Sequence, residues 1–233
     1  MQVSKKENFY LNTIKESLKK EKESGFTFLD IGCNKGFYTQ NLINLFGQNN
    51  TFYLFDASDR FFDISKNKFE NKDNIKLFNS AVSDSVGTIE FYELESENDE
   101  VEGMSSTNNR DVFKNYKSIK KIVDSITLDS FIDDNGVGDI DFIKIDTEGH
   151  ELNVLKGMSK ALRDKKIKFI QIEYGDCLLE TGKNLDDIIN FLSNYDYKLF
   201  DESNGLLVEL TIENSASAIY RSWDNFLIKA NGQ

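Results

Sequence analysis

The sequence predicts an α/β fold with a mostly parallel sheet and helices on both faces. Short apolar runs that suit buried strands alternate with stretches whose apolar residues recur at helical spacing. Glycine and polar residues separate these runs. With 233 residues, 39% of them hydrophobic, the chain can bury a sizeable core. We therefore expect a single domain over residues 1–233.

The first part of the chain alternates without interruption. In the leading segment, 1–24, Phe9, Leu11, Ile14 and Leu18 lie roughly on one stripe, which predicts an amphipathic helix over Asn8–Glu23. The elements expected next are a strand (Phe26–Ile31), a helix that stops at Gly47 (Phe37–Phe46), a strand (Thr51–Asp56), a helix (59–69) and a strand that breaks at Asn79–Ser80 (Asn74–Val82).

The alternation pauses after the third strand. Gly87–Leu94 predicts an added strand, and the polar, acidic stretch 95–111 is either a functional loop or a disordered excursion. The elements expected after it are a short helix capped by Thr127 or Asp129, a strand (Phe142–Ile145), a helix carrying Leu152, Leu155, Met158 and Leu162, a strand (166–175), a helix (184–195) and two or three antiparallel strands. Residues 26–175 thus form the expected core, and residues 176–233 add a helix and strands.

Composition excludes several classes of function. The net charge of −12 would repel phosphate backbones, so we expect no nucleic-acid partner. No apolar stretch approaches the roughly 20 residues needed to cross a bilayer. The N-terminus lacks the apolar centre of a secretory signal, which makes a cytoplasmic location the default. The two cysteines, Cys33 and Cys177, belong to no zinc-binding pattern.

Acidic residues follow several of the expected strands. In parallel sheets ligands bind beyond the carboxyl ends of the strands, so these positions are where a site should form. Four of the five such places hold a carboxylate: Asp30–Gly36, Asp56–Ser58, Asn79–Ala81, Asp146–Glu148 and Glu173–Gly175. A ring of acids at one edge of the sheet predicts a binding site there.

The glycine turn after the first strand discriminates between cofactors. A dinucleotide fingerprint is G-x-G-x-x-G, but here Asn34 stands where the middle glycine would be, between Gly32 and Gly36. Asp30 would oppose a pyrophosphate, whereas it suits the sulfonium and ammonium of S-adenosylmethionine. Asp56 can accept ribose hydroxyls in either case. The turn favours S-adenosylmethionine, with a nicotinamide-dependent oxidoreductase or a non-catalytic cofactor-binding scaffold as alternatives.

A second motif, DFIKIDTEGHELNVLKGM, resembles the FkbM family of S-adenosylmethionine-dependent methyltransferases. The matching residues are Lys144, Asp146, Glu148, Gly149, Glu151, Leu152, Val154, Leu155 and Gly157. Further agreement lies in LDIGCNKGFYT, NSAVSDSVGTIEFY, SITLDSFI and IQIEYG, so the likeness covers about Phe26 to Gly175. The chain departs from the family pattern at Cys33, usually Ala, and at Asp56-Ala57, usually Glu-Pro.

The resemblance implies a class I methyltransferase (Rossmann-like) fold with a seven-stranded, mostly parallel sheet and an antiparallel last strand. It also implies methylation of a hydroxyl on a sugar or another small metabolite. The acceptor would be a small molecule or a glycan, and an exposed last strand could pair subunits into a homodimer. The residues expected at the cofactor are Asp30, Gly32, Asn34, Gly36, Phe37, Asp56, Ala57, Ser80, Ala81 and Asp146.

Four residues are candidates for catalysis. His150, the single histidine of the chain, follows the fourth parallel strand and is a candidate general base. Asp146 is placed to orient the substrate or accept its proton. Glu148 is either a second acid or a residue of the helix N-terminus, and Glu173 could converge on the same space. The three carboxylates could instead bind Mg²⁺. A buried Lys144 would need an acidic partner.

Overall fold

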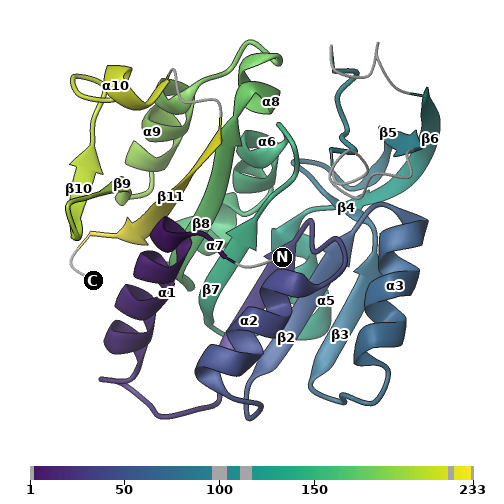
Figure 1. Cartoon of the computed structure of the whole chain (residues 1–233), viewed down its shortest axis with the longest axis horizontal. Coiled ribbons are helices and arrows are strands. Elements are labelled where there is room, and N and C mark those ends of the chain that lie inside the picture. The colour runs from purple at the N-terminus through teal and green to yellow at the C-terminus, as the bar shows by residue number, and fades with distance from the viewer. Residues whose placement is uncertain (1–2, 96–103, 111–116, 220–222, 232–233) are drawn as a thin grey trace.

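An eight-stranded sheet forms the centre of the molecule (Figure 1). The computed structural model describes residues 3–95, 104–110, 117–219 and 223–231. The strands lie side by side in the order β10 (Leu206–Leu210), β9 (Tyr197–Ser203), β11 (Trp223–Ala230), β8 (Ile167–Gly175), β7 (Ile140–Ile145), β1 (Thr27–Ile31), β2 (Thr51–Asp56) and β3 (Ile75–Asn79).

Strand directions confirm the predicted class. The five strands from β3 to β8 are parallel, and β11 runs antiparallel to both β8 and β9. The sheet has one strand more than the resemblance implied, because β10 folds back on β9. Asn204 and Gly205, with φ of 54° and 76°, supply the left-handed turn that such a two-residue hairpin requires.

Helices cover both faces of the sheet (Figure 1). On one face α1 (Lys5–Leu18) and α2 (Phe37–Phe46) pack against an aromatic cluster, and α3 (Asp59–Phe69) adds Phe69 to it. The opposite face is covered by α5 (Leu128–Asn135), α6 (Glu151–Lys156), α7 (Ser159–Arg163) and α9 (Leu185–Ser193), while α8 (Asp176–Leu179) and α10 (Ala216–Ile219) are short. Among the described residues no helix combines the length and hydropathy of a membrane span.

The leading helix begins and ends earlier than its apolar stripe predicted. Ser4 and Glu7 form a capping box, in which each side chain accepts a backbone N–H of the other residue, so α1 starts at Lys5. Tyr10 is buried on the packed face, whereas Phe9 is only half-buried.

The helix expected after residue 146 is two short helices instead of one. Gly157 separates α6 from α7 and packs so tightly that a Cβ there would lie 2.0 Å from the Ser83 carbonyl oxygen. The Asp129 carboxylate starts α7 by accepting the N–H groups of Lys160 and Ala161. Thr127, the other predicted cap, does cap α5.

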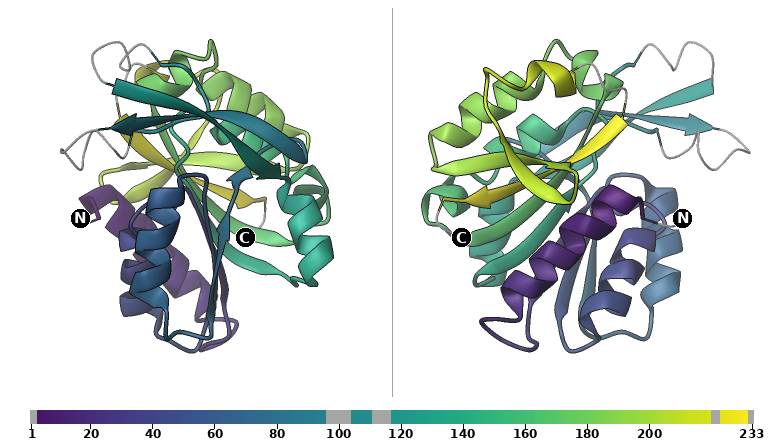
Figure 2. Two further views of the ribbon diagram at one scale, coloured as in Figure 1. Left: turned by 90° about the vertical axis from the view of Figure 1, so that its right-hand side faces the viewer. Right: turned by 60° about the vertical axis from the view of Figure 1, so that its left-hand side comes forward.

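A second sheet stands at the carboxyl end of the main strands. Its strands lie in the order β4 (Ala81–Val82), β6 (Lys117–Ile126) and β5 (Gly87–Glu95). The predicted break at Asn79–Ser80 is confirmed, because β3 belongs to the main sheet and β4 to the second. The β5–β6 ribbon projects beyond the main sheet (Figure 2). Of the polar stretch 95–111, residues 96–103 and 111 lie outside the described residues.

Candidate active site

One face of the main sheet changes from apolar to polar along the strands. Side chains two residues apart on a strand point to the same face. Midway along the strands this face carries side chains that pack under α1 and α2: Phe28, Phe142, Phe169 and Leu227. Two or four residues closer to the site it carries Asp30, Lys144, Gln171, Glu173, Asn225 and Trp223. The strand register thus gathers these groups at one edge.

The glycine turn is pressed against the end of β7. Gly32 has φ of +79°, and a Cβ there would lie 1.8 Å from the Asp146 carbonyl oxygen, so only glycine fits. The N–H of Asn34 donates to the Asp56 carboxylate at 2.7 Å, and the N–H of Lys35 donates to the Asn34 side chain. Both N–H groups are therefore already hydrogen-bonded within the protein. The Asp56 carboxylate accepts the Asn34 N–H group that a pyrophosphate would otherwise bind.

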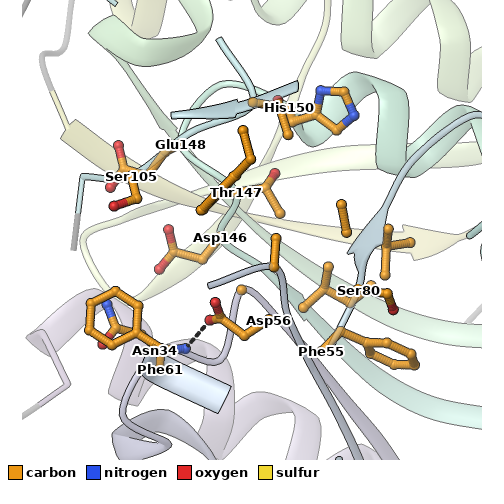
Figure 3. Close-up of a pocket in the computed structure, with 17 residues that line it drawn as sticks. Asn34, Phe55, Asp56, Phe61, Ser80, Ser105, Asp146, Thr147, Glu148 and His150 are labelled. Carbon is orange, nitrogen blue, oxygen red and sulfur yellow. Dashed lines mark hydrogen bonds between the residues drawn. The ribbon is translucent and has the colours of Figure 1, made fainter. Parts of the chain in front are cut away.

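Asp56 borders a small, mostly apolar hollow (Figure 3). Its carboxylate accepts the N–H groups of Asn34 and Ser58, at 2.7 and 2.9 Å, and burial raises its pKa to about 7. The hollow also contains Gly32, Asp146 and the predicted cofactor residues Ala57, Ser80 and Ala81, and its aromatic lining consists of Phe55, Phe61 and Phe91. It can take a flat, apolar ring with polar groups at its rim.

A larger cavity of about 680 Å³ lies on the α1 and α2 side of the same turn. It shares Gly32, Asn34, Asp146 and Glu148 with the hollow, so the two spaces meet over the glycine turn. Asp30 lines the cavity, accepts the Thr39 hydroxyl at 2.5 Å, and has a pKa raised to about 6 by burial.

Two predicted cofactor residues differ in their placement. Phe37 lines the larger cavity, where 46% of it is exposed, and the Lys68 ammonium lies 4.2 Å from its ring centroid. Gly36 lines neither space. It is the N-cap of α2, with φ of 65°, and a Cβ there would lie 2.5 Å from the Phe69 ring.

Three of the four predicted catalytic residues converge. Asp146, Glu148 and Glu173 each place a carboxylate oxygen within 4.8 Å of the other two. Cations already accompany them: Lys144 Nζ lies 3.3 Å from Asp146, and Arg110 Nη1 lies 2.6 Å from Glu148. The expected acidic partner of the buried Lys144 is therefore Asp146.

The three carboxyl groups differ in protonation. Burial alone would raise the pKa of Asp146, but the Lys144 charge and a hydrogen bond with Glu173 lower it. Burial raises the pKa of Glu173 well above its usual range, and raises that of Glu148 to about 8. Asp146 is thus the ionised member of a pair that shares a proton with Glu173, and 34% of its side chain is exposed.

Glu148 is held in an unusual backbone conformation. It has φ of 52°, and Gly149 after it has φ of 100° with the Cys177 carbonyl oxygen 2.4 Å from where a Cβ would lie. The Ser106 hydroxyl donates to the Glu148 carbonyl at 2.6 Å, while Arg110 binds its carboxylate. A left-handed conformation is costly for Glu148, which has a Cβ, although not for Gly149, and strain of this kind concentrates at functional sites.

His150 turns away from this group. Figure 3 shows its ring and the Asp146 carboxylate pointing in opposite directions, although both line the hollow. The Nε2 atom lies 2.9 Å from the Ser83 hydroxyl, and burial lowers the pKa of the imidazole to about 4. His150 is therefore neutral near pH 7, and its role as a base stays a prediction.

Several residues that build the site lie far from its motifs in sequence. Arg110 and Ser106 come from the stretch before β6, and Gln171 accepts the Tyr38 hydroxyl at 2.7 Å in the floor of the cavity. Residues of β11, of α1 and of the segment before α1 complete the lining of the larger cavity: Val3, Glu7, Trp223 and Asn225. The strand register and the packing of α1 bring these residues to the site, and no local sequence motif predicts either of them.

Comparison with known proteins agrees with this geometry. Residues 30–199 match the methyltransferase FkbM domain. Over 176 residues, 72% of this chain and 71% of the relative, the sequence is 27% identical to the 2-O-methyltransferase NoeI of Sinorhizobium fredii (strain NBRC 101917 / NGR234).

Two solved structures share the fold. Methyltransferase FkbM from Methylobacillus flagellatus KT superimposes with a TM-score of 0.56 and 17% identity over 89% of this chain, which spans only 44% of that chain. SMU.1697c from Streptococcus mutans, solved with S-adenosylhomocysteine, gives a TM-score of 0.50 and 12% identity, covering 98% of this chain and 99% of that one. The family match decides against the nicotinamide-dependent alternative. The chain belongs to the FkbM family of S-adenosylmethionine-dependent methyltransferases.

Proposed function

We propose that this enzyme methylates a hydroxyl group of a sugar or another small polar metabolite. The observation that carries the proposal is an ionised, reachable carboxylate, Asp146, at the junction of the hollow and the larger cavity. The 2-O-methyltransferase NoeI, which matches most of the chain, supports oxygen as the accepting atom.

The residues around the turn fit S-adenosylmethionine. Phe55, Phe61 and Phe91 would take its adenine, and Asp56 at their rim would accept ribose hydroxyls. Asp30, on the cavity side of the turn, would face the positively charged end. When bound, the cofactor supplies a methyl group on a sulfonium, which is already a good leaving group.

Asp146 would hold the acceptor hydroxyl and take its proton. A carboxylate of low pKa suffices, because a hydroxyl becomes strongly acidic as its oxygen gains a methyl group. Lys144 keeps Asp146 ionised, and the protonated Glu173 would donate to it and fix its orientation. Glu148, anchored by Arg110, would close the other side of the space.

Cofactor recognition is tested by the Asp30→Asn variant, with calorimetric titration of S-adenosylmethionine and S-adenosylhomocysteine. The variant should bind S-adenosylmethionine about 10–100-fold more weakly, consistent with the loss of a nearby opposite charge. Its affinity for S-adenosylhomocysteine, which lacks the sulfonium charge, should fall much less. Binding of NADH in place of either ligand would contradict the proposal.

Catalysis is tested by following S-adenosylhomocysteine release with a panel of sugars, phenols and amines as acceptors. Asp146→Asn should lower kcat by about 10²–10⁴-fold, the usual contribution of a general base. Dialysis against EDTA tests the alternative that the three carboxylates bind Mg²⁺. A Mg²⁺-dependent enzyme would lose turnover on dialysis and regain it when Mg²⁺ is added. Tight cofactor binding without turnover on any acceptor would instead favour the non-catalytic scaffold.

A further inference from the structure

Part of the wall of the larger cavity lies outside the stretch shared with the FkbM family. The family match covers residues 30–199, whereas Val3, Glu7, Trp223 and Asn225 come from either side of it. The shared stretch contains the glycine turn and the carboxylate group, which serve the step common to methyltransferases. Residues outside it are therefore the place to look for contacts with this enzyme's own acceptor.

Trp223 is an exposed aromatic side chain on that wall. It is 43% exposed, although large aromatic side chains are usually covered. Its partner across the antiparallel ladder is Gly175, which has no side chain to cover the indole. The Arg110 guanidinium lies 5.9 Å from the centroid of the ring and helps to hold it in place.

A hydrogen-bond network fixes polar groups beside Trp223. Asn225 lies two residues further along β11, on the same face, and pairs with Glu173 across the ladder. The Gln171 amide donates to Asn225 Oδ1 at 2.8 Å and to Glu7 Oε1 at 3.3 Å. With its Oδ1 turned toward Gln171, Asn225 directs its NH₂ group away from that bond.

The charge of the cavity selects against anionic acceptors. With Glu148 and Glu173 protonated, the acidic side chains left to carry charge on its wall (Glu7, Asp30 and Asp146) still outnumber the basic ones (Lys35 and Lys144). Phosphate or carboxylate groups would be repelled here. A neutral sugar ring suits the wall, because its C–H face can stack on an indole while its hydroxyls donate to carboxylates and accept from an amide.

We propose that this wall is the acceptor subsite, with Trp223 as the stacking platform for a neutral sugar ring. Asn225 and Glu7 hydrogen-bond the sugar hydroxyls and present one of them to Asp146. This assignment rests on the proposed function and adds to it the residues that recognise the acceptor.

Trp223 is the single tryptophan of the chain, so its fluorescence reports on this wall alone. The protein, saturated with S-adenosylhomocysteine, is titrated with the methyl glycosides of glucose, galactose, mannose, fucose and rhamnose, and separately with catechol, propylamine and inorganic phosphate. We expect a saturable change in emission with at least one glycoside and none with phosphate. A response to catechol or propylamine alone, or to no probe, overturns the assignment.

Three variants locate the effect. Asn225→Ala and Glu7→Gln should each weaken the glycoside response at least about fivefold; Gln keeps the capping box of α1 while removing the charge. Leu206→Ala removes an exposed apolar side chain of β10 that is not part of the cavity wall, and it should leave the response unchanged. An equal effect of all three variants would contradict a specific subsite.

Turnover with the responding glycoside separates recognition from folding. Trp223→Ala should raise KM for the glycoside at least about tenfold with kcat changed less than threefold, and Trp223→Phe should recover part of the loss. If Trp223→Ala instead lowers kcat as much as it raises KM, and also lowers the melting temperature, Trp223 has a structural role. If S-adenosylhomocysteine binds but glycosides do not, this subsite fails while the cofactor assignment stands.

Discussion

At the scale of single residues, the Lys144–Asp146 pair shows how a buried cation sets the state of a carboxylate. Burial would lower the pKa of Lys144, but the surrounding carboxylates, Asp146 first, raise it. The lysine therefore stays charged in the sheet and in turn holds Asp146 ionised. Each group of the pair is stable in its charged form because of the other.

Removing the cation should move the pH dependence of the reaction. In Lys144→Met the pKa of Asp146 is expected to rise, because burial is then opposed only by the hydrogen bond with Glu173. The acid limb of kcat/KM should shift to higher pH accordingly, as measured by S-adenosylhomocysteine release. Lys160→Met, which removes an exposed ion pair with Asp133, is the control. Coincident profiles for wild type and Lys144→Met would show that Asp146 is not the titrating group.

His150 is expected to act on stability through its protonation. Its folded pKa of about 4 lies below the usual 6.5, so the unfolded chain binds the proton more readily. Stability is therefore lost as the pH falls from 6.5 toward 4, by about 3 kcal/mol. Urea unfolding of His150→Gln should show a shallower acid decline than the wild type and nearly unchanged kcat at pH 7.5. A hundredfold loss of kcat with an unaltered acid decline would instead identify His150 as the base.

At the scale of elements, the turn between β7 and α6 is the most constrained connection of the site. Gly149→Ala should destabilise the fold by roughly 2–4 kcal/mol, because its φ is left-handed and a Cβ would meet the Cys177 carbonyl. The folded variant should also have a lower kcat for methyl transfer, since Glu148 and Asp146 lie in the same turn. The matched control is Gly138→Ala, where no atom lies within 4 Å of the new Cβ. Urea unfolding of both variants checks the difference.

The elements that the sequence predicted best are those whose signal is local. Thr51–Asp56 and Phe37–Phe46 agree residue for residue with β2 and α2, because an apolar run or stripe ends at a polar or glycine residue. The split between α6 and α7 was not predictable in this way. It depends on the Ser83 carbonyl, which approaches Gly157 from the residue after β4, far away in the sequence.

The residues of the candidate site also divide into those that a local sequence pattern predicts and those that it does not. Asp30, Asp56 and Asp146 were predictable, since each lies near the end of a strand, or just past it, and the apolar pattern of the sequence predicts these strands clearly. Arg110, Trp223 and Asn225 were not, because one comes from a long polar stretch and two from an antiparallel strand whose register no local pattern sets. The capping box of Ser4 and Glu7, in contrast, was a local signal that the stripe of apolar residues concealed.

At the scale of the whole molecule, the acidic site should make the ligand-free protein less stable at alkaline pH. The pKa values of Asp30, Asp56 and Glu148 are raised to about 6, 7 and 8, so the folded state holds protons that the unfolded chain releases near pH 4. Stability conferred by these protons is lost as the pH rises through the folded values.

Between pH 6.5 and 8.5, where His150 contributes little because it is neutral when folded and at most half-protonated when unfolded, we expect the free energy of unfolding to fall by roughly 2–5 kcal/mol. Urea unfolding without ligand measures the slope. The double variant Asp56→Asn, Glu148→Gln should flatten it, because neither side chain then titrates. A wild-type curve that is level or rises across this range would contradict the raised pKa values.

The face that carries phenylalanine in mid-sheet and acids at its rim has a consequence for engineering. Along β1 and β7 a single pleat separates Phe28 from Asp30 and Phe142 from Lys144. Repacking the buried aromatic layer would shift the strands that aim the reactive groups, so heat tolerance gained there would come at the expense of turnover. Substitutions meant to raise the thermal stability of this enzyme are better placed in the core on the opposite face of the sheet, under α5 and α9.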